Sequence, residues 1–238
     1  MIPLLLVDSP NAVSGAFGFL TRGGIFMWPL LLCSVIAVTV ILLRAVALRE
    51  RVVVPLVLES EIERLVPGAS PERLMRIAQT DSSALGRISL VALQHLRWPR
   101  NENVEAVQTR ARHEMVRLER GLVVLEVITG IAPLLGLLGT VSGLVHVFAH
   151  LGMSAGGTDT KGIALGISEA LNTTIFGLCI AVPSLIAFSY FSKKVEVMAV
   201  EMESLVADLL AKCYYGRVQR EDSAPLRTPP APAHAPLA

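Results

Sequence analysis

The chain has 238 residues, of which 53% are hydrophobic and 17% are charged, and its formal net charge is +1. Soluble domains carry about 25% charged residues, whereas here the mean hydropathy is +0.58. This balance excludes a disordered chain, a collagen-like repeat and a nucleic-acid-binding protein with a dominant basic surface, and it favours long apolar helices in a membrane.

Three runs of the sequence carry almost no charge. Residues 23–43 and 127–158 contain no Asp, Glu, Lys or Arg, and residues 162–192 contain only Glu169. Each run is long enough to cross the hydrocarbon core as a helix, which takes about 20 residues. Because no basic stretch precedes the first run, we interpret it as a retained anchor and not as a cleaved leader. The sequence therefore predicts an all-α membrane protein with three transmembrane helices.

The basic residues predict which way the spans point. Of the 21 Lys and Arg, 13 are arginines between Arg44 and Arg120, and six follow the third run. Only Arg22 and Lys161 remain for the other side. Cytoplasmic segments carry the excess of Lys and Arg, so the N-terminus is expected outside and the C-terminus in the cytoplasm.

These observations divide the chain into segments. The tail from Ser223 holds mostly Pro and Ala and cannot bury a core. We expect an outer N-terminal segment (1–22), spans at 23–43, 123–152 and 162–192, a cytoplasmic helical region (44–122), an outer hairpin (153–161), a cytoplasmic helical extension (193–215) and a disordered tail (216–238).

The cytoplasmic parts have a helical pattern. Apolar residues recur every three or four positions from Val104 to Leu122 and from Val195 to Leu209. Spans two and three are therefore expected to continue into the cytoplasm as very long helices. Ser70, followed by Pro71, and Asn101 are predicted to cap helix N-termini.

Glu169 is the most informative residue, because it interrupts the third apolar run. Placing a carboxylate in a membrane helix costs about 2.5–3.5 kcal/mol on insertion scales, and such residues mark ion pathways. We therefore expect Glu169 to belong to a proton pathway. The alternative is that it lies near enough to the outer end to reach water, or only orders the hairpin.

Small and hydroxyl-bearing residues surround this position. Asn172, Thr173 and Thr174 follow Glu169 within about one turn. One face of span two and one face of span three carry small or polar residues at spacings of three and four: Thr129, Pro133, Gly136, Thr140 and Gly143, and Ala170, Thr174, Gly177, Ala181 and Ser184. Close helix packing explains the glycines, whereas the hydroxyls next to an acid could hold a chain of waters. Pro183 is predicted to kink span three.

Other polar residues near the membrane are weaker candidates. Glu126, six residues after Arg120, is expected at the cytoplasmic end of span two, in an ion pair or interface rather than in proton uptake. His146 and His150 are four residues apart, but two ligands do not make a metal site. No zinc-protease, serine-hydrolase or redox motif is present in the sequence. No metal, cofactor or enzymatic activity is therefore predicted.

Two blocks resemble a known family. Residues 131–143 read IAPLLGLLGTVSG, and residues 166–177 read GISEALNTTIFG, followed by Ala181, Val182 and Pro183. This pair of blocks is similar to the ExbB/TolQ/MotA proton-channel family, and Met27, Trp28 and Pro29 resemble its ExbB branch. The resemblance covers roughly residues 20–210.

The resemblance implies a fold and a function. It implies a homopentamer around a central pore in the bacterial inner membrane, with single-span partners of the ExbD/TolR type in the pore. It also implies that the proton motive force is passed to a TonB- or TolA-like protein that acts on the outer membrane. By matched position, Glu169, Thr140 and Thr174 correspond to pathway residues, and Pro133 and Pro183 to family prolines. Gly139 lies in the first block, with the packing glycines.

Two positions depart from the family pattern, and several readings stay open. Ser142 stands where many members carry Trp, and Asn172 is more polar than the usual aliphatic residue. Three spans disfavour the flagellar MotA branch. The alternatives are a TolQ-like subunit for envelope integrity, a stator driven by Na⁺, and a membrane scaffold that conducts no ions.

Overall fold

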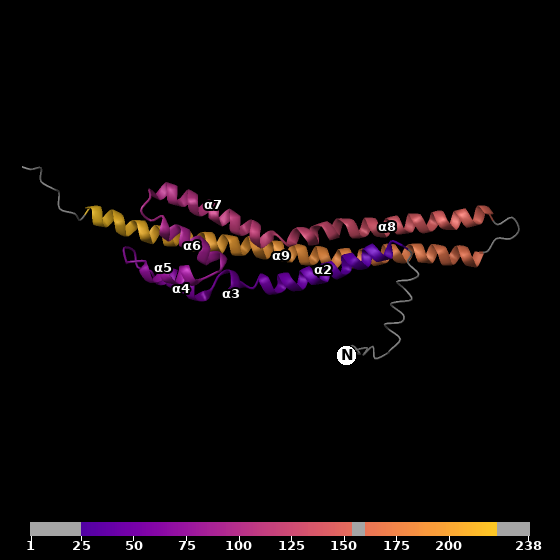
Figure 1. Cartoon of the computed structure of the whole chain (residues 1–238), viewed down its shortest axis with the longest axis horizontal. Helices are drawn as coiled ribbons and strands as arrows, with labels where there is room; N and C mark the ends of the chain where they lie inside the picture. The colour runs from indigo at the N-terminus through magenta and orange to yellow at the C-terminus, as the bar shows by residue number, and fades with distance from the viewer. Residues whose placement is uncertain (1–24, 154–159, 223–238) are drawn as a thin grey trace, which may run out of the picture. The chain divides into compact units, whose positions relative to one another are not determined.

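The structure is a computed structural model that describes residues 25–153 and 160–222. All regular secondary structure in these residues is α-helical (Figure 1), which confirms the predicted all-α class for this part of the chain. The helices are α2 (Met27–Ala47), α3 (Glu50–Val53), α4 (Leu56–Arg64), α5 (Glu72–Thr80), α6 (Ala84–Gln94), α7 (Arg100–Glu119), α8 (Leu122–Met153) and α9 (Thr160–Asp222).

The helices belong to two compact units, each described here by itself. The span unit comprises Met1–Arg49 and Val116–Glu196, and the polar unit comprises Glu50–Met115 and Val197–Ala238, as far as these ranges are described. The N-terminal segment 1–22, the tip of the hairpin at 154–159 and the tail beyond Asp222 lie outside the described residues. The backbone of residues 216–222 belongs to α9, although the sequence placed the start of the tail there.

Three helices are long and apolar enough to cross a membrane, as the sequence predicts. They are α2, α8 and the first part of α9. Large apolar side chains on these helices are turned outward: Leu134 is 64% exposed, Phe148 67% and Ile186 64%. A helix that leaves its apolar side chains exposed is stable in lipid and not in water.

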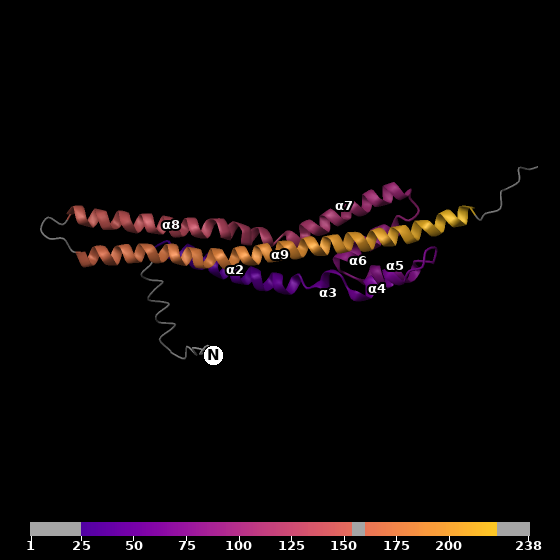
Figure 2. The same cartoon turned by 180° about the vertical axis from the view of Figure 1, so that it is seen from behind.

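Within the span unit, α8 and α9 run side by side in opposite directions, as Figures 1 and 2 both show. Buried residues on α8 recur every three or four positions at Leu122, Leu125, Ile128 and Ala132. Helix α2 packs against α8. The pairing of α8 with α9 is the part of the fold that positions the candidate site.

The expected continuous helix from the cytoplasm into span two is wrong. Helix α7 ends at Glu119, and α8 begins at Leu122. At the break, the Arg44 guanidinium donates a hydrogen bond from Nη1 to the carbonyl oxygen of Leu118, at 3.2 Å. A Cβ at Gly121 would overlap this guanidinium, so a larger residue there would displace the Arg44 side chain. The apolar periodicity does not report this long-range contact.

Helix α9 has no such break. It extends for 63 residues and includes Pro183. A proline inside a helix removes one backbone hydrogen bond. Pro183 is exposed, and the next residue, Ser184, is buried and donates its hydroxyl to the carbonyl oxygen of Ile180 at 2.8 Å. The helix therefore continues through the proline.

The polar unit has its own core, formed by apolar side chains of its helices. These are Leu58, Ile62, Leu74, Ala78, Leu85, Ile88, Ala92, Val107, Met198, Met202, Val206 and Leu209.

A buried ion-pair network stabilises the polar unit. Glu114 on α7 is 3% exposed, and its carboxylate accepts hydrogen bonds from Arg87 Nε at 2.8 Å and Arg87 Nη2 at 2.5 Å. Arg110 Nη2 lies 2.8 Å from the same carboxylate. The hydrogen bond to Glu114 raises the pKa of Arg87 above its ordinary value, and the charges of Glu114 and Asp81 add to the effect while burial opposes it.

The predicted helix caps are partly wrong. Helix α5 begins at Glu72 with Pro71 as its N-cap and no side-chain cap, so Ser70 does not cap it. Asn101 lies inside the first turn of α7, because the backbone of Asn103 already donates to the carbonyl of Pro99 at 3.1 Å. Such shifts of one or two residues are common at helix ends.

Candidate functional site

The contact between α8 and α9 is lined by residues that leave no room for larger side chains. A Cβ at Gly136 would lie 2.9 Å from the Thr173 carbonyl oxygen, and one at Gly139 would lie 2.7 Å from the Thr173 hydroxyl. A Cβ at Gly143 would lie 2.8 Å from the Ala170 Cβ. Small residues let the backbones of two membrane helices approach closely, and the predicted small faces do meet here.

The same contact continues toward the other end of the helices. A Cβ at Gly177 would lie 2.6 Å from the carbonyl oxygen of Ala132, at the turn of α8 that contains Pro133. Pro133 is half-buried inside α8. Of the predicted packing residues, Gly136, Gly139, Gly143 and Gly177 therefore lie in one interface, whereas Pro183 is exposed on α9.

Three threonine hydroxyls gather in this interface. Thr140 Oγ1 and Thr174 Oγ1, from facing helices, are hydrogen-bonded to each other, and either one can donate. Thr140 Oγ1 also lies 3.1 Å from the carbonyl oxygen of Gly136 and 3.2 Å from that of Ala170. Thr174 Oγ1 lies 3.0 Å from the Gly136 oxygen. Thr173 Oγ1 lies 2.6 Å from the Ala170 oxygen and 3.4 Å from the Gly136 oxygen.

We call this group (Gly136, Thr140, Ala170, Thr173 and Thr174) the hydroxyl cluster. A hydroxyl has one proton to donate and two lone pairs that accept. Thr140 and Thr174 each have more acceptors within reach than protons to give. Their hydrogen bonds can therefore be arranged in more than one way without moving the helices.

The members of the cluster differ in burial. Thr173 is 2% exposed, so its hydroxyl is enclosed between the helices. Thr140 and Thr174 are half-buried, at the edge of the contact, and so is Asn172. Thr140 and Thr174 are thus the hydroxyls that a neighbouring group can reach.

Glu169 occupies the position just before Ala170 in α9, and Thr173 follows it by four residues, about one helical turn. Its side chain lies outside the described part of the structure. The predicted role of Glu169 in a proton pathway therefore stays a prediction, based on the sequence and on its place in the helix.

Glu126 and the histidines add little to this site. Glu126 is exposed on α8, its backbone carbonyl accepts the Thr129 hydroxyl at 2.6 Å, and no basic side chain of the described residues pairs with it. The described residues contain no cluster of His, Cys, Asp and Glu that could hold a metal ion. His146 is exposed, and the side chain of His150 lies outside the described part.

Residues 80–204, more than half of the chain, match the MotA/TolQ/ExbB proton channel family. The chain belongs to this family. The matched region contains all of α8, the hydroxyl cluster and most of α9.

Relatives within the proton channel family are named for the ExbB branch. The chain is 37% identical over 194 residues to the ExbB-like biopolymer transport protein 1 of Synechocystis, covering 78% of this chain and 72% of that protein. It is 32% identical to the biopolymer transport protein exbB1 of Vibrio cholerae, over 68% of this chain and 72% of that protein. The match to ExbB of Helicobacter pylori is 44% over 82 residues, or 34% and 56% of the two chains. The predicted resemblance to the ExbB-like branch is confirmed, and the chain is a membrane protein.

Some features of the site of this ExbB-like chain were not predicted. The acceptors in the hydroxyl cluster are the backbone carbonyls of Gly136 and Ala170, which small-residue spacing alone does not identify. Arg44 binds the end of α7, whereas the sequence predicted for it only a place among the cytoplasmic arginines. Its partner Leu118 is 74 residues away in sequence, and no local signal connects them.

Proposed function

We propose that this chain is the channel-forming subunit of a proton-driven energy transducer in the bacterial inner membrane. In this proposal it forms a homopentamer, holds a single-span partner of the ExbD/TolR type, and passes the energy of the proton gradient to a TonB-like protein for transport across the outer membrane. Family membership and the ExbB names of the relatives support the proposal.

The observation that carries the proposal is the hydroxyl cluster between two apolar helices. Thr140 and Thr174 offer interchangeable hydrogen bonds between two helices that are apolar and carry few charged residues. Glu169 lies within about a turn of this cluster along α9. A proton carrier on a partner helix could exchange protons next to these groups without crossing an apolar stretch.

The energy available is sufficient for such work. Each proton that crosses the membrane supplies about 2.3 kcal/mol per 100 mV, and each pH unit of gradient adds about 1.4 kcal/mol. One or two protons therefore match the cost of about 2.5–3.5 kcal/mol of placing a carboxylate in a membrane helix.

The test is proton flux into vesicles that contain the chain together with its single-span partner. We expect the double variant Thr140→Val, Thr174→Val to lose about tenfold or more of the flux, since removing one positioned proton-transfer group typically costs 10²–10⁴-fold in chemistry. Thr→Ser at both positions keeps the hydroxyls and is expected to keep most of the flux. Glu169→Gln is expected to abolish it.

The matched control is Thr39→Val on α2, whose hydroxyl donates only to the Val35 carbonyl at 2.7 Å. It removes a hydroxyl from a span without touching the cluster. Flux in the Thr140/Thr174 double variant equal to that of the Thr39 variant would remove the hydroxyl cluster from the proton pathway. No proton flux above background in the unaltered complex would favour a scaffold that conducts no ions. Flux that follows a Na⁺ gradient and not a pH gradient would assign the other ion.

A further inference from the structure

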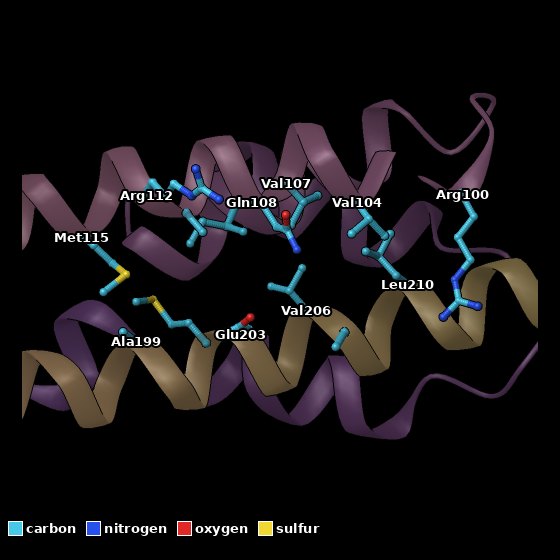
Figure 3. Close-up of a pocket in the computed structure, with 14 residues that line it drawn as sticks. Arg100, Val104, Val107, Gln108, Arg112, Met115, Ala199, Glu203, Val206 and Leu210 are labelled. Carbon is cyan, nitrogen blue, oxygen red and sulfur yellow. The ribbon is translucent and has the colours of Figure 1, made fainter. Parts of the chain in front are cut away.

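The polar unit contains a pocket that the proposed function does not use. It lies between α7 and α9 and has a volume of about 460 Å³. Figure 3 shows Met115 of α7 and Val206 of α9 pointing into it from facing helices. Its apolar lining also includes Val104, Val107, Met202 and Leu210. Flexible Met side chains are typical of grooves that receive an apolar helix face.

Charged and polar residues lie around this apolar lining. Arg100, Gln108 and Arg112 come from α7, and Glu203 comes from α9; all four are exposed. Among the described residues, neither arginine has an ion-pair partner. Two arginines and one glutamate leave the pocket with a net positive charge, so it favours an acidic and apolar occupant.

The outer face of α4 has these properties. It presents Leu56 and Val57, which are 60% and 64% exposed, beside Glu59, Ser60 and Glu63, and the five residues line a shallow hollow. Helical spacing puts Leu56, Ser60 and Glu63 on the side of α4 away from the buried residues Leu58 and Ile62. Glu59 lies at the edge of this side. No basic side chain of the described residues pairs with Glu59 or Glu63.

The dimensions of the two surfaces agree. Helix α4 has nine residues, about 14 Å of helix at 1.5 Å per residue. Arg100 and Arg112 are twelve positions apart on α7, about 18 Å along its axis. The whole of α4 can therefore lie between the two arginines. Glu59 and Glu63, four positions or about 6 Å apart, both fall within that interval.

The two surfaces cannot meet within one chain. Lys212 of α9 donates to the backbone carbonyls of Ile62 and Glu63 at 3.0 Å each and so holds α4 against α9. In Figures 1 and 2, α4 lies on the side of α9 away from α7. The complementary surfaces of one polar unit therefore face different ways.

We propose that the α7–α9 pocket is a docking site for α4 of a second copy of this chain. The contact is heterologous, because each copy offers α4 to one neighbour and its pocket to the other. Repeated contacts of this kind close into a ring when the rotation between neighbouring copies closes. The inference rests on the homo-oligomer in the proposed function and adds the surfaces that join its cytoplasmic parts.

A disulfide trap tests the contact directly. The three cysteines, Cys33, Cys179 and Cys213, are first replaced by Ala. Two differently tagged copies, one with Ser60→Cys and one with Gln108→Cys, are then co-expressed and oxidised in membranes. We expect a dimer carrying both tags, on the order of tenfold more abundant than with Thr80→Cys in place of Ser60→Cys, because a disulfide needs Cα atoms within about 7 Å. Thr80 is exposed at the end of α5.

Charge reversal gives an independent test. Glu59→Arg with Glu63→Arg, or Arg100→Glu with Arg112→Glu, is expected to lower the yield of the crosslinked dimer by about tenfold. All four changes together are expected to restore it, since the swapped charges match again. Glu72→Arg with Arg76→Glu, on the exposed face of α5, is the matched control and is expected to leave the yield unchanged.

The outcomes separate this inference from the proposed function. Oligomers on native gels with no excess of the 60–108 crosslink over the control would overturn the α4 contact and leave the channel proposal intact. A strong 60–108 crosslink in a chain without proton flux would support the α4 contact and overturn the channel proposal. Recovery of monomers only would overturn the contact together with the proposed assembly.

Discussion

Glu114 shows how a single residue can hold one of the two units together. Its carboxylate is almost completely buried and satisfies two arginines, one of them bidentately. Removing one partner of such a group leaves buried charge uncompensated, which typically costs 3–5 kcal/mol. Arg87 and Arg110 are partly exposed, so water can take over some of their hydrogen bonds.

For Glu114→Gln we therefore expect a loss of about 3 kcal/mol in unfolding free energy, the lower end of that range. Urea unfolding followed by tryptophan fluorescence measures it, in a Trp28→Phe background so that only Trp98 of the polar unit reports. Glu105→Gln, an exposed position on the same helix, is the control and is expected to change the free energy by less than about 0.5 kcal/mol. Equal losses in both variants would contradict a special role for the buried pair.

The pH dependence of this network follows from the direction of the Arg87 shift. Its pKa is raised, mainly by the hydrogen bond to Glu114. A group with a raised folded pKa contributes its full stabilisation below the unfolded pKa, and the contribution disappears only as the pH rises through the folded value. Since the ordinary pKa of arginine already lies far above neutral pH and that of Arg87 is raised further, Arg87 should cause no loss of stability between pH 7 and pH 10. A fall in the same Trp98 transition over this range that disappears in Arg87→Lys would disprove the assignment.

At the scale of helices, the close approach of α8 to α9 depends on which glycine of α8 is considered. A Cβ at Gly136 would lie 2.9 Å from a backbone oxygen and 3.0 Å from the Thr174 Cα, whereas a Cβ at Gly130 of the same helix would meet nothing within 4 Å. Backbone atoms cannot move aside as the end of a flexible side chain can, so overpacking costs about 1–3 kcal/mol.

Gly136→Ala is therefore expected to destabilise the α8–α9 pair by about 1–3 kcal/mol. Gly130→Ala is expected to have no effect or to stabilise α8 by up to about 1 kcal/mol, since Ala is the better helix former. Thermal melting in detergent, followed by circular dichroism, compares the two. If Gly136→Ala melted at or above the temperature of Gly130→Ala, the close approach would not be limiting.

The elements that sequence could predict are those with a local or periodic cause. The three apolar helices follow from the absence of charge, and the α8–α9 contact follows from small residues at spacings of three and four. The hydrogen bond of Arg44 to Leu118 at the break near Gly121 could not be predicted, because the two residues are 74 positions apart in the sequence. The pairing of Arg87 with Glu114 was hidden for the same reason, because the two residues are 27 positions apart. The carbonyl acceptors of the hydroxyl cluster carry no sequence signal at all.

At the scale of the whole molecule, the distribution of basic residues predicts the orientation of the chain in the membrane. We expect the polar unit on the cytoplasmic side and the hairpin near residue 158 outside. Arg73 is an exposed position of α5, so a cysteine there can react with a maleimide. In a cysteine-free background, Arg73→Cys should react with a membrane-impermeant maleimide only after the inner membrane is permeabilised, because the polar unit is expected in the cytoplasm. Thr158→Cys should react before permeabilisation. The opposite pattern would invert the topology and, with it, the direction of proton entry.

The hydrogen bonds of the hydroxyl cluster should be visible in the infrared spectrum of one backbone carbonyl. One carbonyl oxygen, that of Gly136, lies within hydrogen-bonding distance of three hydroxyls. Each donated hydrogen lengthens the C=O bond, so the amide I band of a ¹³C=¹⁸O label at this glycine should sit at an unusually low wavenumber. If proton transport rearranges the threonine hydrogen bonds, the band will shift while the protein conducts. If the cluster only packs the helices, the band will stay at the same wavenumber.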